Sequence, residues 1–291
     1  MPADSLVDIR IMVTRPVHQA QVFCELLAEQ GAQVIRLPVI EIEAIALSQK
    51  MTAVIETINE IDFAIFISPN AVEHGLAALF AHGRIPDKLK LVTIGKASAQ
   101  KMQQLLGRAP DIYPEEQYNS EALLALDSLQ SDKVNNKKII IFRGQGGREL
   151  LAASLKQRGA RVDYAEVYQR KIPELQSGVL ASIFGTNSKL SEYEGADCRG
   201  SKCRGPNSPD IITVTSSEGL NNLVAMIDCS SDEQHDSYLQ QLWQTPLVVV
   251  TEKMRHSAQT LGFKNAIMIA ARASDDALLE SVLEWAKIRK Q

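Results

Sequence analysis

The chain has 291 residues, of which 45% are hydrophobic and 23% are charged, and this length is enough for two hydrophobic cores. A net charge of −4 and an aromatic content of 5% argue against a nucleic-acid-binding protein. No apolar run approaches the roughly 18–20 residues of a membrane-spanning helix, and the first residues, MPADSLVDIR, contain no apolar signal core. We therefore expect a cytoplasmic monomer that binds neither nucleic acid nor membrane.

Metal and nucleotide motifs are missing from the sequence. The cysteines Cys24, Cys198, Cys203 and Cys229 are not followed by a second Cys or His pair at metal-ligand spacing, and the histidines show no such spacing either. The stretch RGQGGRE lacks the final glycine of a dinucleotide fingerprint, and no Walker-type phosphate loop occurs. We expect free thiols, no metal and no cofactor.

Strand-like apolar runs alternate with helix-like segments along nearly the whole chain. In chain order the predicted strands are IRIMVT, DFAIFI, LKLVTI, KKIIIF, DIITVT and PLVVVT. Each precedes a helix-like segment, such as HQAQVFCELLAEQG after the first. Nearly continuous apolar strands that alternate with helices are typical of α/β proteins whose parallel sheets are covered on both faces.

These strand–helix units resemble one another in pairs. The paired positions are Arg15 with Arg143, Ser68 with Ser216, Lys96 with Lys253, and Ser120 with Ser274, and we expect the last two serines to be helix N-caps. Any single pair has an alternative explanation, which is chance similarity among amphipathic helices. Four pairs together favour a duplicated lobe.

The order of the pairs predicts the path of the chain, because one lobe is a circular permutation of the other. We predict two doubly wound parallel-sheet lobes of similar topology, joined by a two-stranded β linker. The first lobe comprises 1–38 plus 170–291, the second comprises 42–166, and the crossings lie near 37–44 and 164–171. The β-rich crossings LPVIEIEA and YAEVYQRK are able to pair as a short ladder.

Residues 185–209 interrupt this order. They are rich in Gly, Ser, Asn and charged residues and have no apolar periodicity. We expect a flexible surface insertion in the first lobe, with a partner-binding loop as the alternative.

Polar side chains recur at the predicted carboxyl ends of strands, where ligands bind in open parallel sheets. Ser68 and Ser216 each end a strand and begin a helix, whose free N–H groups favour anions. The alternative role of each serine is capping alone. Cations follow other strands, namely Arg15, Lys96, Arg143 and Lys253, with Arg148 one turn further on. For each of these residues, the alternative is a solvated cation on an exposed loop. If the cations instead gather around one site, they predict a ligand with several negative charges.

Five segments in this order resemble the uroporphyrinogen-III synthase family. They are VTRPVHQAQVFCELLAEQGAQVIRLPVIEI, DFAIFISPNAVEHGL, VTIGKASAQ, FRGQGGRELLAASLKQRGARVDYAEVYQRK and DIITVTSSEGLNNL. The chain departs from the family pattern at two places. One is the insertion, and the other is the stretch VVVTEKMRHSAQ, which contains Lys253 and Met254 and in which members often have a glycine followed by threonines.

The resemblance implies two α/β lobes with an active site between them and no metal or organic cofactor. It implies that hydroxymethylbilane, a small-molecule substrate with an acetate and a propionate on each pyrrole, is cyclised to uroporphyrinogen III. Loss of the hydroxymethyl oxygen gives an azafulvene, an electrophile that forms a bond with the substituted α-carbon of the last ring. The resulting spiro intermediate opens and recloses with that ring inverted.

The resemblance also implies site residues. Tyr168, in the VYQ segment, corresponds to the family's candidate acid. A phenol remains protonated at neutral pH and can donate a proton. Packing in the linker is the alternative role of this residue. The expected substrate-binding residues are Thr14, Arg15, Ser68, Asn70, Lys96, Ser98, Arg143, Gly144, Arg148, Ser216, Ser217 and Lys253. The competing hypothesis is a cytoplasmic two-lobed binding or sensor protein for a polycarboxylate or another small anion.

Overall fold

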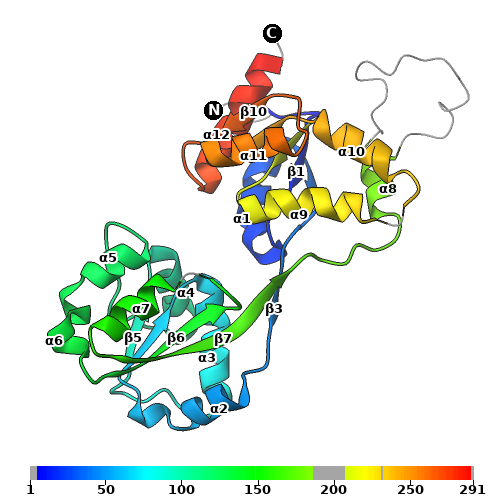
Figure 1. The fold of residues 1–291 in the computed structure, drawn as a ribbon. Helices are drawn as coiled ribbons and strands as arrows, with labels where there is room; N and C mark the ends of the chain where they lie inside the picture. The colour runs from blue at the N-terminus through cyan, green and yellow to red at the C-terminus, as the bar shows by residue number, and fades with distance from the viewer. Residues whose placement is uncertain (1–4, 148, 186–206, 231, 290–291) are drawn as a thin grey trace, which may run out of the picture. The chain divides into compact units, whose positions relative to one another are not determined.

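The computed structural model describes residues 5–147, 149–185, 207–230 and 232–289. They form an α/β fold with two five-stranded sheets in which parallel pairing dominates. The chain divides into two compact units. Unit 1 is Met1–Glu41 with Ile172–Gln291, and unit 2 is Ile42–Lys171. Figure 1 shows the blue N-terminal segment folded together with the yellow-to-red C-terminal part in unit 1.

The sheet of unit 1 has the strand order β10-β9-β8-β1-β2, and all its neighbouring strands are parallel. In register, Met12 lies opposite both Ile35 and Ile212. The strands are β1 (Arg10–Val13), β2 (Gln33–Arg36), β8 (Ile211–Thr213), β9 (Leu247–Val249) and β10 (Ile267–Ile269).

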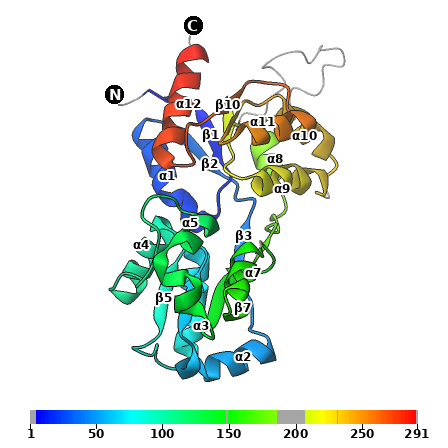
Figure 2. The ribbon, with the colours of Figure 1, turned by 60° about the vertical axis from the view of Figure 1, so that its left-hand side comes forward.

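Helices cover both faces of this sheet. One core contains Met12, Ile212 and Val249 together with residues of α8–α11, and the other contains Ile11 and Ile211 together with residues of α1 and α12. Figures 1 and 2 show α1 and α12 side by side. The helices are α1 (Val17–Glu29), α8 (Val179–Phe184), α9 (Ser217–Asp228), α10 (His235–Trp243), α11 (Glu252–Thr260) and α12 (Asp275–Arg289).

The sheet of unit 2 has the order β3-β7-β6-β4-β5, and its pairs β7–β6, β6–β4 and β4–β5 are parallel. Directly after β3, the Ile45 N–H donates to the carbonyl oxygen of Val167 in β7 at 3.2 Å. The strands are β3 (Glu41–Ala44), β4 (Phe63–Phe66), β5 (Lys90–Thr93), β6 (Lys138–Gly144) and β7 (Arg161–Lys171).

Unit 2 also has a core on each face of its sheet. Phe66 and Phe142 belong to the core that α2, α3 and α4 cover, and Ile65 and Ile141 to the core that α5, α6 and α7 cover. The helices are α2 (Gln49–Glu56), α3 (Pro69–Ala81), α4 (Lys96–Leu106), α5 (Ser120–Ala125), α6 (Ser131–Val134) and α7 (Leu150–Gln157), with short 3₁₀ turns η1 (Ile58–Glu60) and η2 (Asp127–Leu129). Because helices cover both faces, the inner strand β4 is apolar and buried at every position.

The two sheets share a local order of strands that matters for the site. In unit 2, β4, which precedes Ser68, lies between β5 and β6. In unit 1, β8, which precedes Ser216, lies between β9 and β1. In each sheet, therefore, the strand followed by a serine lies between one followed by a lysine and one that carries or precedes an arginine.

Three details differ from the sequence prediction. The N-cap of α5 is Asn119, whose side chain accepts from the Ala122 N–H, so the prediction of Ser120 as the cap is wrong by one residue. The Ser274 hydroxyl oxygen is buried and has no hydrogen-bond partner within the described part of the chain, so it does not cap α12. Residues 186–206 of the predicted insertion lie outside the described residues, but Ser208 near its end is buried and donates to Gln241 Oε1 at 2.9 Å.

Candidate functional site

Ser68 and Ser216 begin helices directly after strands, as predicted. The Ser68 hydroxyl oxygen accepts a hydrogen bond from the Ala71 N–H at 3.0 Å at the start of α3. The Ser216 hydroxyl oxygen accepts from the Gly219 N–H at 2.9 Å at the start of α9. Both serines therefore satisfy one of the free donors of a helix N-terminus.

Ser68 has a second partner, the phenol of Tyr168. The two hydroxyl oxygens lie 3.1 Å apart, although the residues are 100 positions apart in the chain. Tyr168 is only 3% exposed and lies in the core beneath α3, with the His74 ring centroid 5.8 Å from its own. Packing therefore fixes the ring, and Ser68 contacts its polar end.

Gly144 provides the space for this ring. It ends β6 opposite Tyr168, immediately after a shift of register at Arg143. A Cβ atom at Gly144 would lie 2.6 Å from two ring carbons of Tyr168, which is closer than real side chains approach. The next residue, Gln145, donates its N–H to the Tyr168 carbonyl oxygen at 2.8 Å. The end of β6 thus holds Tyr168 through both side chain and main chain.

Arg143 is buried and bound to two carboxylates. Its guanidinium donates to Glu149 Oε1 at 3.0 Å and to Glu166 Oε1 at 3.1 Å, and lies 3.8 Å from the centre of the Tyr164 ring. Glu166 Oε1 also accepts from the Gly146 N–H at 3.3 Å, which holds the loop after β6. Within unit 2, Arg143 therefore organises this loop.

The ionisation of this group follows from its contacts. Burial, and then the hydrogen bond to Glu149, raises the pKa of Tyr164 to about 12. The hydrogen bonds from Tyr164 and Arg143 lower the pKa of Glu149. Burial lowers the pKa of Arg143, but its hydrogen bonds to the two carboxylates outweigh this and raise it. At neutral pH the group is a neutral phenol between a fixed guanidinium and carboxylates.

The other predicted residues of unit 2 follow the neighbouring strands. Asn70 is buried in the first turn of α3. Lys96 begins α4 and is exposed, and Ser98 in the same turn is 2% exposed. Arg148 lies outside the described residues.

In unit 1 the predicted residues lie after β1, β8 and β9. The Thr14 hydroxyl donates to the Thr213 carbonyl oxygen at 2.9 Å, which joins the ends of β1 and β8. Arg15 forms an ion pair with Asp275 at the start of α12. Ser217 is the first residue of α9, and Lys253 is an exposed residue in the first turn of α11.

Four residues that contact the predicted arginines were not predicted from the sequence, namely Glu149, Tyr164, Glu166 and Asp275. One signal was available for two of them, because Tyr164 and Glu166 are two positions apart in a strand and so share a face. Nothing in the sequence indicated that Glu149 and Asp275 contact arginines.

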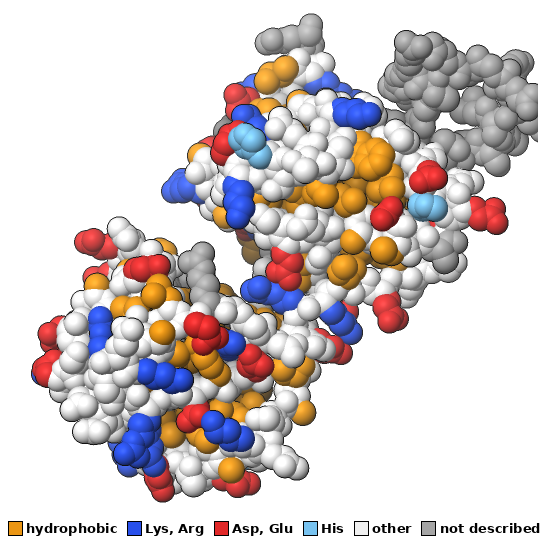
Figure 3. Space-filling view, viewed as in Figure 1, with side chains coloured by type: hydrophobic (Ala, Val, Ile, Leu, Met, Phe, Trp, Pro, Cys, Tyr) orange, Lys and Arg blue, Asp and Glu red, His pale blue; other side chains and the backbone are white. Residues whose placement is uncertain are grey.

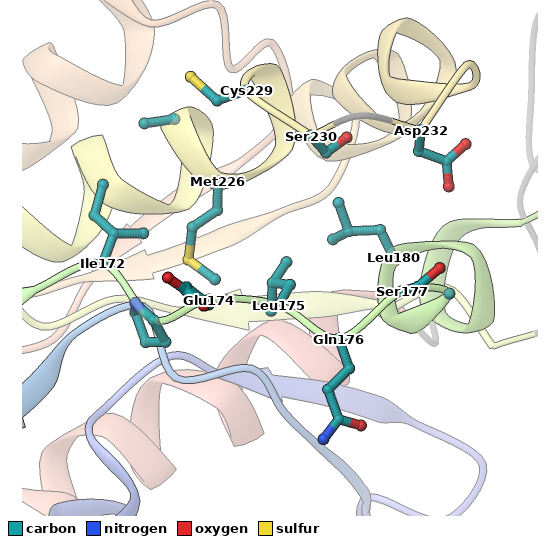
Figure 4. Close-up of a pocket in the computed structure, with 13 residues that line it drawn as sticks. Ile172, Glu174, Leu175, Gln176, Ser177, Leu180, Met226, Cys229, Ser230 and Asp232 are labelled. Atoms are coloured by element: carbon teal, nitrogen blue, oxygen red, sulfur yellow. The ribbon is translucent and has the colours of Figure 1, made fainter.

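A separate cavity of about 640 Å³ lies within unit 1, between the segment 172–178 and the C-terminal end of α9 (Figure 4). Met226 extends from α9 toward Glu174 and Leu175 in this view. None of the predicted site residues lines it. It is therefore distinct from the strand ends.

On the face shown in Figure 3, basic and acidic side chains are interspersed over both units. Among the described residues, no group of three or more His, Cys, Asp or Glu could hold a metal ion. No helix within the described ranges has the length and apolar character needed to cross a membrane.

Comparison with known proteins identifies the family. The family model described as "Uroporphyrinogen-III synthase HemD" matches residues 21–285. A uroporphyrinogen-III synthase of Salmonella typhimurium is 30% identical over 94% of this chain and 99% of its own length. The corresponding protein of Escherichia coli is 27% identical over the same shares.

Solved structures show the same fold. The crystal structure of uroporphyrinogen-III synthetase from Helicobacter pylori aligns over 95% of this chain and 99% of its own, with a TM-score of 0.55 and 14% identity. A mutant uroporphyrinogen III synthase from Thermus thermophilus aligns over 97% and 100%, with a TM-score of 0.51 and 13% identity. The chain therefore belongs to the uroporphyrinogen-III synthase family, the cyclising lyases of tetrapyrrole biosynthesis.

Proposed function

We propose that the chain cyclises hydroxymethylbilane to uroporphyrinogen III, with inversion of the last pyrrole ring and loss of water. The observation that carries the proposal, beyond family membership, is the Tyr168 phenol held at 3.1 Å from Ser68 at the N-terminus of α3. A phenol close to the N-terminus of a helix, whose N–H groups favour anions, supports the proposal. The comparisons do not favour the alternative of a binding or sensor protein for a small anion.

Tyr168 is the proposed acid. As the C–O bond of the hydroxymethyl group breaks, its electron pair goes to oxygen, which takes the phenol proton and leaves as water. The pyrrole nitrogen donates electrons into the azafulvene that forms. The substituted α-carbon of the last ring then attacks this electrophile, the spiro intermediate opens and recloses, and the proton lost in restoring the aromatic pyrrole balances the one that Tyr168 gave.

Orientation is the main task of the remaining residues, because the free substrate closes without inversion. Substrate carboxylates are proposed to bind at the strand ends of both units. The residues are Thr14, Arg15, Ser68, Asn70, Lys96, Ser98, Arg143, Gly144, Arg148, Ser216, Ser217 and Lys253. Lys96 and Lys253 are exposed, whereas Arg15 already contacts Asp275 and Arg143 already contacts two glutamates. A carboxylate reaching either arginine would compete with those partners.

The proposal includes the organisation expected from the sequence: two lobes of similar topology with a two-stranded β linker, in a cytoplasmic monomer. The shared strand order of the two sheets supports the similar topology. The neighbouring positions of β3 and β7, close to the residues where the chain passes between units, support the linker. Light scattering after gel filtration tests the oligomeric state.

The activity is tested by supplying purified protein, treated with a chelator, with hydroxymethylbilane generated enzymatically. We expect the type III isomer as the main product. A parallel incubation without the protein provides the type I isomer as reference. A product pool that contains only type I in both incubations would refute the proposed function.

A further inference from the structure

We propose that Ser68 is a positioning residue that donates its hydroxyl proton to the Tyr168 oxygen and stabilises the negative charge that develops there. This rests on the proposed function, in which Tyr168 gives up its proton. The geometry that carries it is the 3.1 Å separation of the two hydroxyl oxygens.

Either hydroxyl could be the donor in this pair. The Ser68 oxygen already accepts the Ala71 N–H, and a hydroxyl whose oxygen accepts a hydrogen bond becomes a stronger donor. If Ser68 donates, the phenol proton remains available for the departing oxygen of the substrate. If Tyr168 donated instead, its proton would already be held by Ser68. Proton transfer from Tyr168 therefore favours the arrangement in which Ser68 donates.

The burial of the phenol makes this bond important for the reaction. Tyr168 is 3% exposed, so little water reaches its oxygen to solvate a phenolate. The ring is packed within the core of unit 2, and Gly144 lies against one side of it. As the proton leaves, the bond from Ser68 becomes a hydrogen bond to a charged oxygen, which is about twice as strong as a neutral one. A contact that strengthens only in the transition state increases kcat more than it lowers KM.

Capping and positioning by Ser68 can be separated by experiment. Ser68→Gly removes the hydroxyl but keeps a residue that is tolerated at a helix N-cap. Ser68→Thr keeps a hydroxyl for both contacts. Ser48→Gly is the matched control, because Ser48 caps α2 in the same unit with the Met51 N–H 3.3 Å from its oxygen. Circular dichroism melting reports the folding of each variant.

The experiment is a double-mutant cycle of Ser68→Gly with Tyr168→Phe, measured as kcat and KM for hydroxymethylbilane. In the wild-type background we expect Ser68→Gly to lower kcat about 10-fold, an effect measured separately from the rise in KM that follows from loss of its proposed contact with a substrate carboxylate. In the Tyr168→Phe background it should lower kcat less than about 2-fold, because Ser68 acts through the phenol oxygen. Ser68→Thr should restore most of kcat, and Ser48→Gly should leave it unchanged.

An equal loss of kcat from Ser68→Gly in both backgrounds would overturn the inference, and so would wild-type kcat in Ser68→Gly. If Ser68→Gly does not fold, Ser68→Asp takes its place in the same cycle, because an ionised aspartate caps helices but cannot donate a hydrogen bond to Tyr168. The proposed function is judged separately, by whether the wild-type protein forms the type III isomer at all.

Discussion

A Cβ atom at Gly144 would lie 2.6 Å from Cε2 and Cζ of Tyr168, so this position accepts only glycine while the ring stays in place. The backbone conformation at position 144 does not itself require a glycine, since Gly144 is not among the glycines with positive φ. The requirement comes from the ring alone. The residue that ends β6 therefore determines where the proposed acid lies.

We predict that Gly144→Ala destabilises the protein and lowers its activity. The added methyl group must displace either the Tyr168 ring or the end of β6, and overpacking of this kind costs about 1–3 kcal/mol. Urea denaturation measures the change in free energy of unfolding. The same substitution in a Tyr168→Ala background should cost much less, because the clash is gone; an equal cost in both backgrounds would show that another contact is responsible.

Tyr168→Phe should lower kcat by about 10–100-fold, at or below the low end for general acid catalysis, because the pyrrole nitrogen already assists loss of the oxygen. KM should change little, and the type III isomer should still dominate the product, since inversion depends on how the substrate is held. Steady-state kinetics and isomer analysis measure both. The aromatic ring remains to pack under α3, so thermal melting should be near that of the wild type. A Phe variant with wild-type kcat would leave Tyr168 with a packing role only.

Arg15→Ala should raise KM about 5-fold with a smaller effect on kcat, because binding of a substrate carboxylate is lost equally in ground state and transition state. The ion pair with Asp275 provides the matched variant. Asp275→Asn removes the competing carboxylate and should lower KM. Kinetics at low salt test this pair, and an unchanged KM in both variants would place Arg15 outside the site.

The free energy of unfolding should fall as pH rises from about 10 to about 12. The pKa values of Tyr164 and Tyr238 are both raised to about 12, in each case by burial first and then by a hydrogen bond to a carboxylate. An unfolded tyrosine titrates near pH ~10, so the folded state favours the neutral phenol. That stabilisation is complete below about pH 10 and is lost as pH approaches the folded value.

Urea denaturation at a series of alkaline pH values tests this prediction. Tyr164→Phe and Tyr238→Phe should each show a shallower decline than the wild type, and the two effects should add, because the residues lie in different units. Identical slopes in the wild type and both variants would mean that other groups cause the alkaline loss.

The sequence by itself indicated the apolar strands β1, β4, β5, β6, β8 and β9 and the way several helices begin, but not the strands β2 and β10. The runs at Phe63–Phe66 and Ile211–Thr213 are apolar at every position but the threonine, which indicates strands buried on both faces. Ser68 and Ser216 were recognisable as helix caps because capping depends on a residue and the N–H groups three positions later. Where two polar residues were adjacent, as at Asn119 and Ser120, this local rule did not decide which one caps.

Only the tertiary structure decided which side chains contact one another at the strand ends. Ser68 meets Tyr168 across 100 positions of sequence, and Arg15 meets Asp275 across 260. Arg143, which the sequence presents as a cation at the end of a strand, is bound by Glu149 and Glu166. Periodicity shows which face of an element a residue occupies, but the partner depends on which elements the sheet brings together and on where space remains, as beside Gly144.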